Sequence, residues 1–498
     1  MMATQASAPS AYAKNWRQVN WRSVEAYVYQ MQTRIAESVR EKRWGKAKAL
    51  QHILSRSFYG RLWAVKRITA NKGSRTPGID GVTWNSPGKR WKAAVNLKVR
   101  GYKSRPLRRI YIPKKNGKKR PLGIPTLHDR AMQELFALGL RPIAETVGDK
   151  NSYGFREKRS LHDAIKMAFI SLARKVSAQW VLEADIKACF DRISHDWLLE
   201  NIPLPKWMLR QWLKAGYMES STLYPTEAGT PQGGIISPIL CTMALDGLEA
   251  LVIKGRNKKQ SKLNTIRYAD DFIITGSNPE ILLNEVKPEV ERFLQERGLI
   301  LSEEKTKLSH IDDGFNFLGF NVRKYKQKLL IRPEDGKVQS LLEKVRAFLV
   351  QHRGIPFYVM LLKLNSIVRG WAYAYRHCVA KERMKYADNR IYFLIKKWLQ
   401  RECRSKNWPW IAKKSRRRIR GRVVYFARHQ SAKGEIRTVE GFQAADLPIR
   451  YHIKIQGDAT PYDPEYVEYF AKRKKKRKMA AVKDKWHMKS SSFQKLAA

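Results

Sequence analysis

Apolar residues recur at helical spacing through residues 15–70. In the first such run they fall three or four positions apart with charged residues between them, which predicts an amphipathic helix. The residues of this run are Val24, Val28, Met31, Ile35 and Val39. A second run of the same period ends at Val65, and the Gly- and Pro-rich stretch 71–81 predicts a loop.

The period shortens to that of strands near residue 107. Residues 107–113 alternate between apolar and basic, residues 115–118 have turn composition, and residues 120–124 return, which predicts a β-hairpin. No acidic residue occurs from Arg105 to Thr126. A solvated edge strand and a clamp for a nucleotide triphosphate explain this basic hairpin equally well.

The middle of the chain mixes both patterns. The predicted helices cover residues 127–175, 196–220, 235–251 and 282–296, and the predicted strands lie at 180–186, 266–275 and 315–322. A Gly- and Pro-rich loop at 229–234 precedes the third helix. We therefore expect an α+β domain with a small, mostly antiparallel sheet.

The last third changes character again. From residue 341 to about residue 407 the apolar positions keep helical spacing without strand signals, which predicts a separate helical bundle. Basic residues then fill 413–420, a short β-like segment follows at 423–426, and a second basic cluster occupies 472–478. We expect the polar tail beyond that cluster to be disordered.

The charge of the chain points to a polyanionic partner. The sequence holds 98 Lys and Arg against 44 Asp and Glu, a formal net charge of +54. Self-repulsion on that scale is tolerable when a nucleic acid neutralises it. Basic residues run through the whole sequence and often lie beside aromatic ones. We therefore expect an extended basic channel that contacts phosphates and stacks on unpaired bases.

Cysteines and apolar runs exclude other classes of protein. The four cysteines are far apart and form no C-x-x-C pair, which argues against a disulfide framework or a structural zinc site and favours a reducing compartment. No apolar run is long enough to span a bilayer, and residues 1–14 lack the apolar core of a secretory signal. We expect a cytoplasmic protein, with an organellar location as the less favoured alternative.

Three aspartates form the strongest chemical signal. Asp270 and Asp271 lie at the expected tip of the 266–275 hairpin, and Asp185 lies near the end of the strand at 180–186. Three carboxylates on two neighbouring strands suit a magnesium site, whereas two on one turn are explained by the turn alone. Magnesium prefers oxygen ligands, and apart from Cys189 no histidine or cysteine lies close in sequence, so zinc and iron are disfavoured.

The order and spacing of several segments resemble those of reverse transcriptases. These segments are residues 153–156, 185–191, 230–238, 268–271, 304–306 and 317–320. Residues 76–81, 112–125 and 364–371 are similar to group II intron-encoded proteins in particular. The resemblance covers roughly residues 50–410 and rests on about eight motifs in order.

The resemblance implies a right-hand polymerase, in which fingers and a palm with a small antiparallel sheet precede an α-helical thumb. The implied divisions are an N-terminal helical extension at 1–70, reverse transcriptase fingers and palm at 71–335, a helical thumb and maturase domain at 336–410, and a basic DNA-binding region with a disordered tail at 411–498.

The resemblance also implies roles for individual residues. Asp185 and Asp270 would bridge two Mg²⁺ ions, with Asp271 as a third acidic ligand. The Ile186 carbonyl would complete one ligand shell. Phe190 would crowd a ribose 2′-hydroxyl, although a core aromatic is the plain alternative. The residues implied to bind the incoming deoxynucleoside triphosphate are Arg108, Lys114, Arg120, Ile186, Phe190, Gln232 and Gly233.

Contacts with nucleic acid are implied elsewhere along the chain. Tyr268 would pack beside the primer end, and Lys305 would touch primer or template, with a solvated lysine as a nearly equal alternative. The other residues expected to contact RNA or DNA are Arg369, Trp371, Arg416, Arg417, Arg418, Lys474, Lys475 and Lys476. Specific contact with a DNA target and nonspecific affinity for RNA explain the last cluster equally well.

The implied function is that of an RNA-dependent DNA polymerase and maturase of a mobile group II intron. Such a protein binds its intron RNA, assists splicing and reverse transcribes the inserted RNA for retrohoming. Its partners would be intron RNA, a DNA target or primer and deoxynucleoside triphosphates, without a membrane. A splicing-only maturase and another kind of bacterial reverse transcriptase remain alternatives. Because no paired cysteines follow residues 462–464, we expect no H-N-H endonuclease.

Overall fold

The computed structural model describes residues 14–113, 117, 119–220, 222–231, 233–419, 421–430 and 434–493, with side chains up to residue 480 and at Val482. Lys114 and Gln232, both expected to bind nucleotide, lie outside these ranges. The chain divides into two compact units. The first contains Met1–Ala164, Trp180–Leu308 and Ile455–Lys472, and the second contains Ile165–Gln179, Ser309–Lys454 and Arg473–Ala498.

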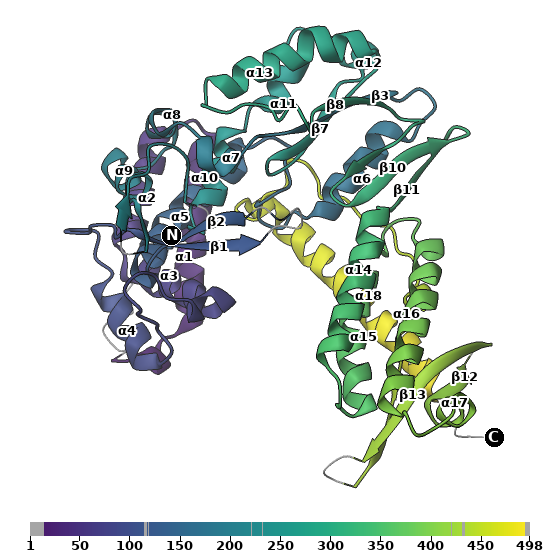
Figure 1. Cartoon of the computed structure of the whole chain (residues 1–498). Coiled ribbons are helices and arrows are strands. Elements are labelled where there is room, and N and C mark those ends of the chain that lie inside the picture. Colours follow the sequence, from purple (N-terminus) through teal and green to yellow (C-terminus); the bar gives the residue numbers. More distant parts are fainter. Residues whose placement is uncertain are drawn as a thin grey trace. The chain divides into compact units, whose positions relative to one another are not determined.

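Packed helices form one side of the first unit (Figure 1). Helices α1 (Trp21–Arg40), α2 (Trp44–Arg56) and α3 (Phe58–Ala70) all pack against α5 (Leu127–Val147), and α4 (Pro87–Asn96) packs on α3. Every apolar residue of the first predicted run is buried in α1, so the helical spacing of that run is confirmed. Most polar residues between them face solvent, as expected of an amphipathic helix, but Gln32 and Ser38 are buried.

Two sheets complete the first unit. The first has the order β2-β1-β4-β5, with β1 (Leu107–Pro113), β2 (Lys119–Ile124), β4 (Tyr217–Glu219) and β5 (Thr222–Tyr224). The second has the order β6-β7-β3-β8, with β6 (Asn264–Tyr268), β7 (Asp271–Gly276), β3 (Trp180–Asp185) and β8 (Lys307–His310). The basic hairpin predicted near residue 107 and the hairpin predicted at 266–275 are therefore both confirmed.

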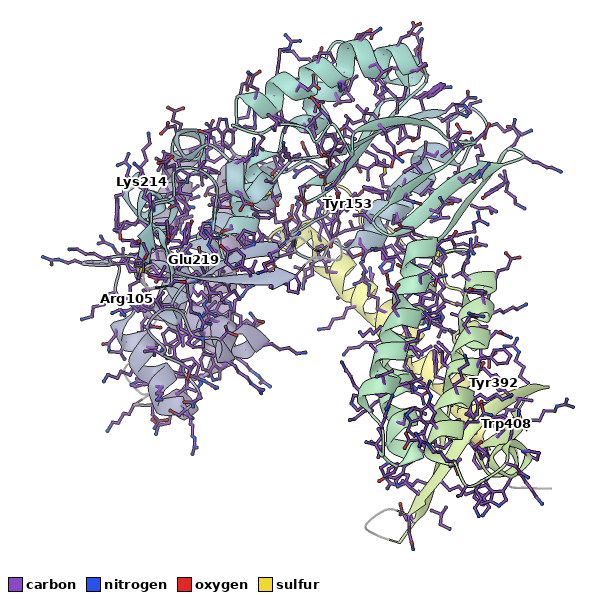
Figure 2. The ribbon with its side chains drawn as sticks, in the orientation of Figure 1. Arg105, Tyr153, Lys214, Glu219, Tyr392 and Trp408 are labelled. Carbon is purple, nitrogen blue, oxygen red and sulfur yellow. The ribbon has the colours of Figure 1, made fainter. Side chains whose placement is uncertain are left out.

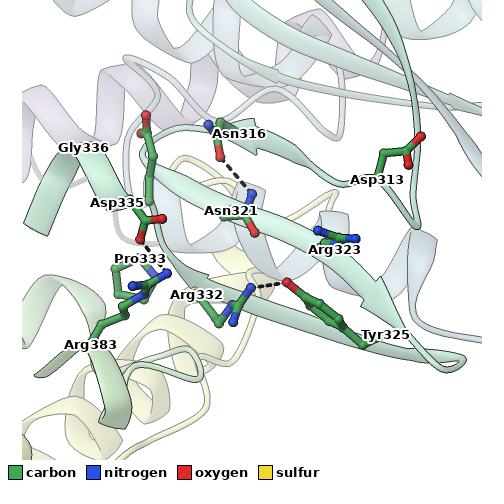
Figure 3. A pocket seen from close by; sticks show the side chains of 11 residues that line it. Asp313, Asn316, Asn321, Arg323, Tyr325, Arg332, Pro333, Asp335, Gly336 and Arg383 are labelled. Carbon is green, nitrogen blue, oxygen red and sulfur yellow. Dashed lines mark hydrogen bonds and ion pairs between the residues drawn. The ribbon is translucent and has the colours of Figure 1, made fainter. Parts of the chain in front are cut away.

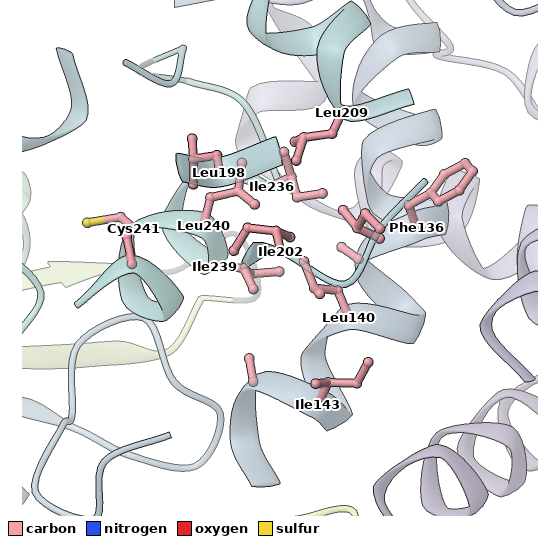
Figure 4. Close-up of a cluster of buried hydrophobic side chains, with 14 of the residues drawn as sticks. Phe136, Leu140, Ile143, Leu198, Ile202, Leu209, Ile236, Ile239, Leu240 and Cys241 are labelled. Carbon is pink, nitrogen blue, oxygen red and sulfur yellow. The ribbon is translucent and has the colours of Figure 1, made fainter. Parts of the chain in front are cut away.

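Apolar side chains from four helices meet in the core of this unit (Figure 4). Phe136, Leu140 and Ile143 come from α5, and Leu240 comes from α10. The bounds of the remaining helices here are α6 (Leu161–Leu172, shared with the second unit), α7 (Cys189–Arg192), α8 (His195–Asn201), α9 (Lys206–Leu213), α10 (Ser237–Ala244), α11 (Leu248–Ile253), α12 (Lys258–Ser261), a π-helical turn (Ile281–Val286) and α13 (Lys287–Gln295).

The second unit combines a helical bundle with two small sheets. Its sheets have the orders β11-β10-β9 and β12-β13-β14. Its elements are β9 (Phe315–Phe317), β10 (Phe320–Tyr325), β11 (Lys328–Pro333), α14 (Asp335–Gln351), α15 (Phe357–Tyr375), α16 (Lys381–Glu402), α17 (Trp408–Ser415), β12 (Arg416–Ile419), β13 (Arg422–Gln430) and β14 (Ile436–Glu440). The helical bundle expected after residue 341 is confirmed by α14, α15 and α16. Among the helices described, none combines the length and hydropathy that a bilayer-spanning segment needs.

Several predicted elements were wrong in detail. The helix expected at 196–220 ends with α9, because Gly216 has a φ of 66° and the next residues pair with β1 as β4. The strand expected at 315–322 is two antiparallel strands, since Leu318 and Gly319 make a turn with φ of 51° and 82°.

The C-terminal segments also differ from expectation. The arginines after residue 415 form strand β12, which pairs with β13. The tail expected to be disordered begins as helix α18 (Val467–Phe493), whose sequence has no Gly or Pro and is rich in Lys, Arg and Ala, which favour helices. The fourfold division of the chain stays a proposal; β9, β10 and β11 cluster with the helical bundle rather than with the first unit.

Candidate functional site

Three carboxylates gather at one end of the β6-β7-β3-β8 sheet. In the register of β3 and β7, Asp185 lies opposite Asp271, and in that of β6 and β7, Tyr268 lies opposite Asp271. Asp270 and Ala269 form the two-residue turn between β6 and β7. Directly opposed residues have Cβ atoms about 4.5–5.5 Å apart, so the register alone brings the carboxylates together. We term Asp185, Asp270 and Asp271 the acidic cluster.

The members of the acidic cluster interact electrostatically. Burial raises the pKa of Asp270, and the charge of Asp185 adds to that increase. The nearby cations Arg120 and Lys305 act in the opposite direction. Asp271 keeps an exposed edge, yet desolvation, a hydrogen bond shared with Asp185 and the charge of Asp270 raise its pKa to about 7. Neighbouring carboxylates repel one another when ionised, so a cation among them would be favoured.

The donor atoms suit a hard divalent cation. The cluster offers carboxylate oxygens, the ligands that magnesium prefers. The backbone bridge between Ile186 and Leu301 uses the Asp185 carbonyl and the Lys187 amide, so it leaves the Ile186 carbonyl out. In the ranges that the structure describes, no three His, Cys, Asp or Glu side chains are already gathered tightly enough to hold an ion. The residues therefore fit magnesium by ligand type, while Asp185 is engaged by Lys305, 2.6 Å away.

A glycine whose role the sequence did not reveal supports the acidic turn. A Cβ built on Gly154 would lie 2.2 Å from the Ala269 nitrogen and 2.8 Å from the Tyr268 carbonyl carbon. The Tyr153 amide donates to the Arg267 carbonyl at 2.9 Å, which holds this segment along β6. Only glycine allows the segment to lie directly on the turn that carries the cluster. The motif at residues 153–156 was recognisable in the sequence. The contact between Gly154 and Ala269 was not, because it joins parts of the chain that are distant in sequence.

A buried ion pair anchors the hairpin from behind. Arg267 in β6 is almost fully buried and pairs with Asp246. Burial raises the pKa of Asp246 to about 6, and Arg267 opposes that increase. Removing one partner of a pair this deeply buried would leave an uncompensated charge inside the protein. The ion pair therefore fixes the position of β6. A buried arginine carries no recognisable signature in a sequence with so many basic residues, and sequence reasoning missed it.

Phe190 lies where the glycine-rich loop meets α7. Its ring is half-buried and meets Phe155 edge-on, with the centroids 5.9 Å apart. The Thr230 amide donates to the Phe190 carbonyl at 2.6 Å, and the Gly229 amide donates to the Ile193 carbonyl at 2.9 Å. A Cβ on Gly229 would lie 2.6 Å from the Phe190 carbonyl oxygen, so this close approach requires glycine. These backbone hydrogen bonds therefore fix the position of Phe190 relative to the glycine-rich loop.

The basic hairpin joins the same region. The register of β1 and β2 puts Arg108, half-buried, and Arg120, exposed, on one face of the hairpin. Arg120 is close enough for its charge to act on Asp270. Gly233 of the glycine-rich loop has a φ of 121° and lies close to β2. A Cβ on Gly233 would be 2.8 Å from the Gly123 carbonyl oxygen of that strand. The hairpin, the glycine-rich loop and the acidic cluster thus converge within the first unit.

The expected nucleic acid contacts near the helices have mixed environments. Tyr268 is half-buried beside the acidic turn. Arg369 in α15 is exposed, with its guanidinium 5.2 Å from the Phe442 ring centroid. Trp371 is half-buried, with its ring centroid 5.2 Å from that of Tyr375. Arg369 and Trp371 belong to the second unit, whereas the acidic cluster belongs to the first.

The arginine run after residue 415 divides into structural and exposed members. Arg416 donates to the Tyr392 hydroxyl and lies 4.8 Å from the Trp408 ring centroid, and Figure 2 labels both aromatic residues. Arg417 forms an ion pair with Glu440 of β14. Arg416 therefore holds the β12-β13-β14 sheet to α16 and α17, and Arg417 links β12 to β14 within that sheet. The other residues of the two basic clusters that are expected to contact nucleic acid, Arg418, Lys474, Lys475 and Lys476, are all exposed.

A polar pocket of about 310 Å³ lies over the β9-β10-β11 sheet (Figure 3). Arg383 pairs with Asp335 at 2.6 Å across its edge, and Arg332 contacts the Tyr325 hydroxyl. Three arginines and three carboxylates line the pocket, so their charges balance and offer no net attraction for a phosphate. This pocket contains none of the expected site residues.

Three known families match consecutive parts of the chain. Residues 16–97 match the N-terminal domain of reverse transcriptase, residues 112–322 match reverse transcriptase (RNA-dependent DNA polymerase), and residues 338–431 match the group II intron maturase-specific domain. The solved structure of telomerase from Candida albicans gives a TM-score of 0.36 at 14% identity, over 62% of this chain and 64% of that one.

Curated relatives extend over much of the sequence. Protein YkfC of Escherichia coli is 33% identical over 300 residues, 51% of this chain and 78% of that protein. Group II intron-encoded protein LtrA of Lactococcus lactis is 32% identical over 364 residues, 57% of this chain and 60% of LtrA. A reverse transcriptase domain, an RNA-dependent DNA polymerase, is thus followed by a maturase domain, which implies intron RNA binding. The chain belongs to the family of group II intron-encoded reverse transcriptases and maturases.

Proposed function

We propose that the chain copies RNA into DNA at the acidic cluster, with two Mg²⁺ ions held by Asp185, Asp270, Asp271 and the Ile186 carbonyl. The observation that carries this proposal is the register of β3, β6 and β7, which places three mutually repelling carboxylates at one sheet end. Bound magnesium would activate the primer 3′-oxygen and neutralise the leaving pyrophosphate. Carboxylate and carbonyl oxygens are hard donors, which favour magnesium over softer metals.

The protein's own residues would hold and select the incoming nucleotide. Arg120 and Arg108 lie on one face of the basic hairpin, where fixed cations stabilise charge on a triphosphate. Phe190 would crowd a ribose 2′-hydroxyl, since backbone bonds fix its position beside the glycine-rich loop. Gly233 would let that loop approach the nascent base pair. Tyr268, beside the turn, would pack against the primer end.

The two compact units support a division into fingers and palm followed by a helical thumb. In this proposal the first unit supplies the reaction centre, and α14, α15 and α16 of the second unit form a right-hand polymerase's thumb, which also contacts intron RNA. Exposed Arg369, Arg418 and the lysines of α18 would add phosphate contacts. The protein would bind its intron RNA, assist splicing and reverse transcribe the inserted RNA for retrohoming.

Primer extension on an RNA template tests the copying activity. Replacement Asp270→Asn removes one charge of the cluster at nearly constant volume and should slow extension by at least about a hundredfold. The control Asp313→Asn removes an exposed carboxylate outside the cluster and should leave the rate unchanged. Equal rates for wild type and Asp270→Asn would refute the proposed centre.

Splicing of the RNA that flanks the gene separates copying from the splicing-only alternative. Purified wild-type protein should both splice this RNA and extend a primer on it, and Asp270→Asn should splice but not extend. A wild-type protein that splices without extending any primer would make this chain a maturase alone.

A further inference from the structure

The side chain of Lys305 is directed at the acidic cluster. Its Nζ lies 2.6 Å from Asp185 Oδ2, although 64% of the lysine side chain remains exposed. The three carboxylates of the cluster all act on its charge, and the hydrogen bond to Asp185 raises the pKa of Lys305 most strongly. The ammonium therefore pairs directly with Asp185 of the cluster in this structure.

The backbone holds the lysine in that place. The Ser302 amide donates to the Asp185 carbonyl at 2.8 Å, so the loop after Leu301 is tied to the end of β3. The Lys305 amide donates to the Ser302 carbonyl at 3.1 Å, which folds the loop back over the strand end. A local turn thus presents the lysine to Asp185, and a freely solvated lysine would need no such support.

A lysine in this position shares its binding site with a metal ion. Magnesium would take the same Asp185 oxygen that now accepts from the ammonium, and two cations cannot both lie against it without repulsion. The lysine must therefore swing away when metal binds, and its exposed, flexible stem permits that movement. Removing it should strengthen metal binding to the free protein.

We propose that Lys305 is a built-in counter-ion of the acidic cluster, which weakens divalent metal binding to the free protein and is displaced from Asp185 as metal enters. The inference rests on the proposed metal site, and it adds Lys305 as a cation that competes with the metal for Asp185. It also gives Lys305 a role before any primer or template arrives, distinct from the strand contact that its sequence position implies.

The exposure of Lys305 limits the size of the effect. Ion pairs between exposed side chains are weak, because water screens the charges and the side chains lose freedom on pairing. Their usual strength corresponds to a change of about two- to fivefold in an equilibrium constant. We expect Lys305→Ala to tighten metal binding by that factor.

The neighbouring Lys307 provides a matched control. Its Nζ lies 3.3 Å from Glu183 Oε1, and its side chain is 61% exposed. Replacement Lys307→Ala therefore removes an equally exposed, ion-paired lysine two positions away, but one that pairs with a carboxylate outside the acidic cluster. It changes the net charge of the protein by the same amount.

Binding of Mn²⁺ to the full chain, followed by electron paramagnetic resonance without substrate, tests the proposal. We expect Lys305→Ala and Lys305→Gln to bind Mn²⁺ about two- to fivefold more tightly than wild type, and Lys307→Ala and Lys305→Arg to bind it as wild type does. Unchanged or weaker binding in both neutral Lys305 variants would overturn the proposal. Equal tightening in Lys307→Ala would also overturn it, because net charge alone would then explain the effect.

One further variant separates this proposal from the metal site itself. Asp270→Asn should weaken Mn²⁺ binding if the acidic cluster is the site. Should it bind as wild type does, the proposed metal site fails and the counter-ion with it. Should Asp270→Asn weaken binding while neither neutral Lys305 variant tightens it, the site stands and the counter-ion alone is refuted.

Discussion

Replacing Gly154 by alanine would push a methyl group into the turn that carries Asp270. The new Cβ would lie 2.2 Å from the Ala269 nitrogen and 3.0 Å from its Cα, and both are backbone atoms that cannot rotate aside. Ala269 already has a φ of 60°, a conformation with little room for adjustment in a residue with a Cβ. The whole tip of the hairpin must therefore move.

The displacement can be estimated from the contact. Bringing the Cβ and the Ala269 nitrogen to an ordinary separation requires an opening of about 1 Å, and such a misplacement of reacting groups costs about a hundredfold in rate. Overpacking of this kind destabilises a protein by about 1–3 kcal/mol. We expect Gly154→Ala to remain folded and to bind RNA, but to extend a primer about a hundredfold more slowly.

Single-turnover primer extension, measured beside RNA-binding affinity, gives the two quantities needed. Gly45→Ala is the matched control, because Gly45 is exposed in α2 with no atom within 4 Å of its added Cβ. That control should extend primers at the wild-type rate. If the Gly154→Ala protein extended primers at the wild-type rate, the segment around Gly154 would not constrain the turn at Ala269 and Asp270. That result would refute the reasoning.

Other substitutions probe the remaining parts of the site. Gly233→Ala should raise the Michaelis constant for deoxynucleotides about tenfold, because a φ of 121° strains any side chain; an unchanged constant in steady-state extension would contradict this. Phe190→Val should raise ribonucleotide use relative to deoxynucleotide use by about tenfold in paired incorporation assays, and an unaltered ratio would mark Phe190 as a core residue. Asp271→Asn should abolish extension yet raise the melting temperature in EDTA, since it removes repulsion worth about 0.5–2 kcal/mol; a lower melting temperature would count against it. Arg418→Ala should lower the salt slope of RNA binding by about 1, whereas Arg417→Ala should instead lower the melting temperature, and the reverse pattern would overturn this division.

Local patterns were enough to predict the hairpins of the reaction centre. Two apolar, β-branched runs around a turn predicted the β6–β7 hairpin, and that placed Asp270 at the tip without knowledge of the fold. The resemblance implied that Asp185 shares a site with Asp270 and Asp271, but its pairing with Asp271 was not predicted, because the spacing of apolar residues does not encode strand partners distant in sequence. The contacts of Gly154 and Lys305 were not predictable at all, since each joins a loop to a strand more than a hundred residues away.

In the second unit, charge was the least reliable guide to which residues contact nucleic acid. The arginine run after residue 415 suggested an exposed nucleic acid contact. In the structure, Arg416 donates a hydrogen bond to the Tyr392 hydroxyl, and Arg417 forms an ion pair with Glu440. A sequence with 98 basic residues gives no sign of which are used internally. Strand alternation does not separate them either, because Arg416 and Arg418 share one face of β12 although only Arg418 of the two is exposed.

The balance of charge around the acidic cluster differs from that around Glu134, a buried carboxylate that pairs with both Arg67 and Arg141. Across the described residues, the acidic cluster has three carboxylates and one ion-paired cation, Lys305. Repulsion between them costs stability that a chain so rich in arginine could remove with one more ion pair. The cost is explained if cations from solution complete the site, and the exposed lysine then keeps the carboxylates together until those cations arrive.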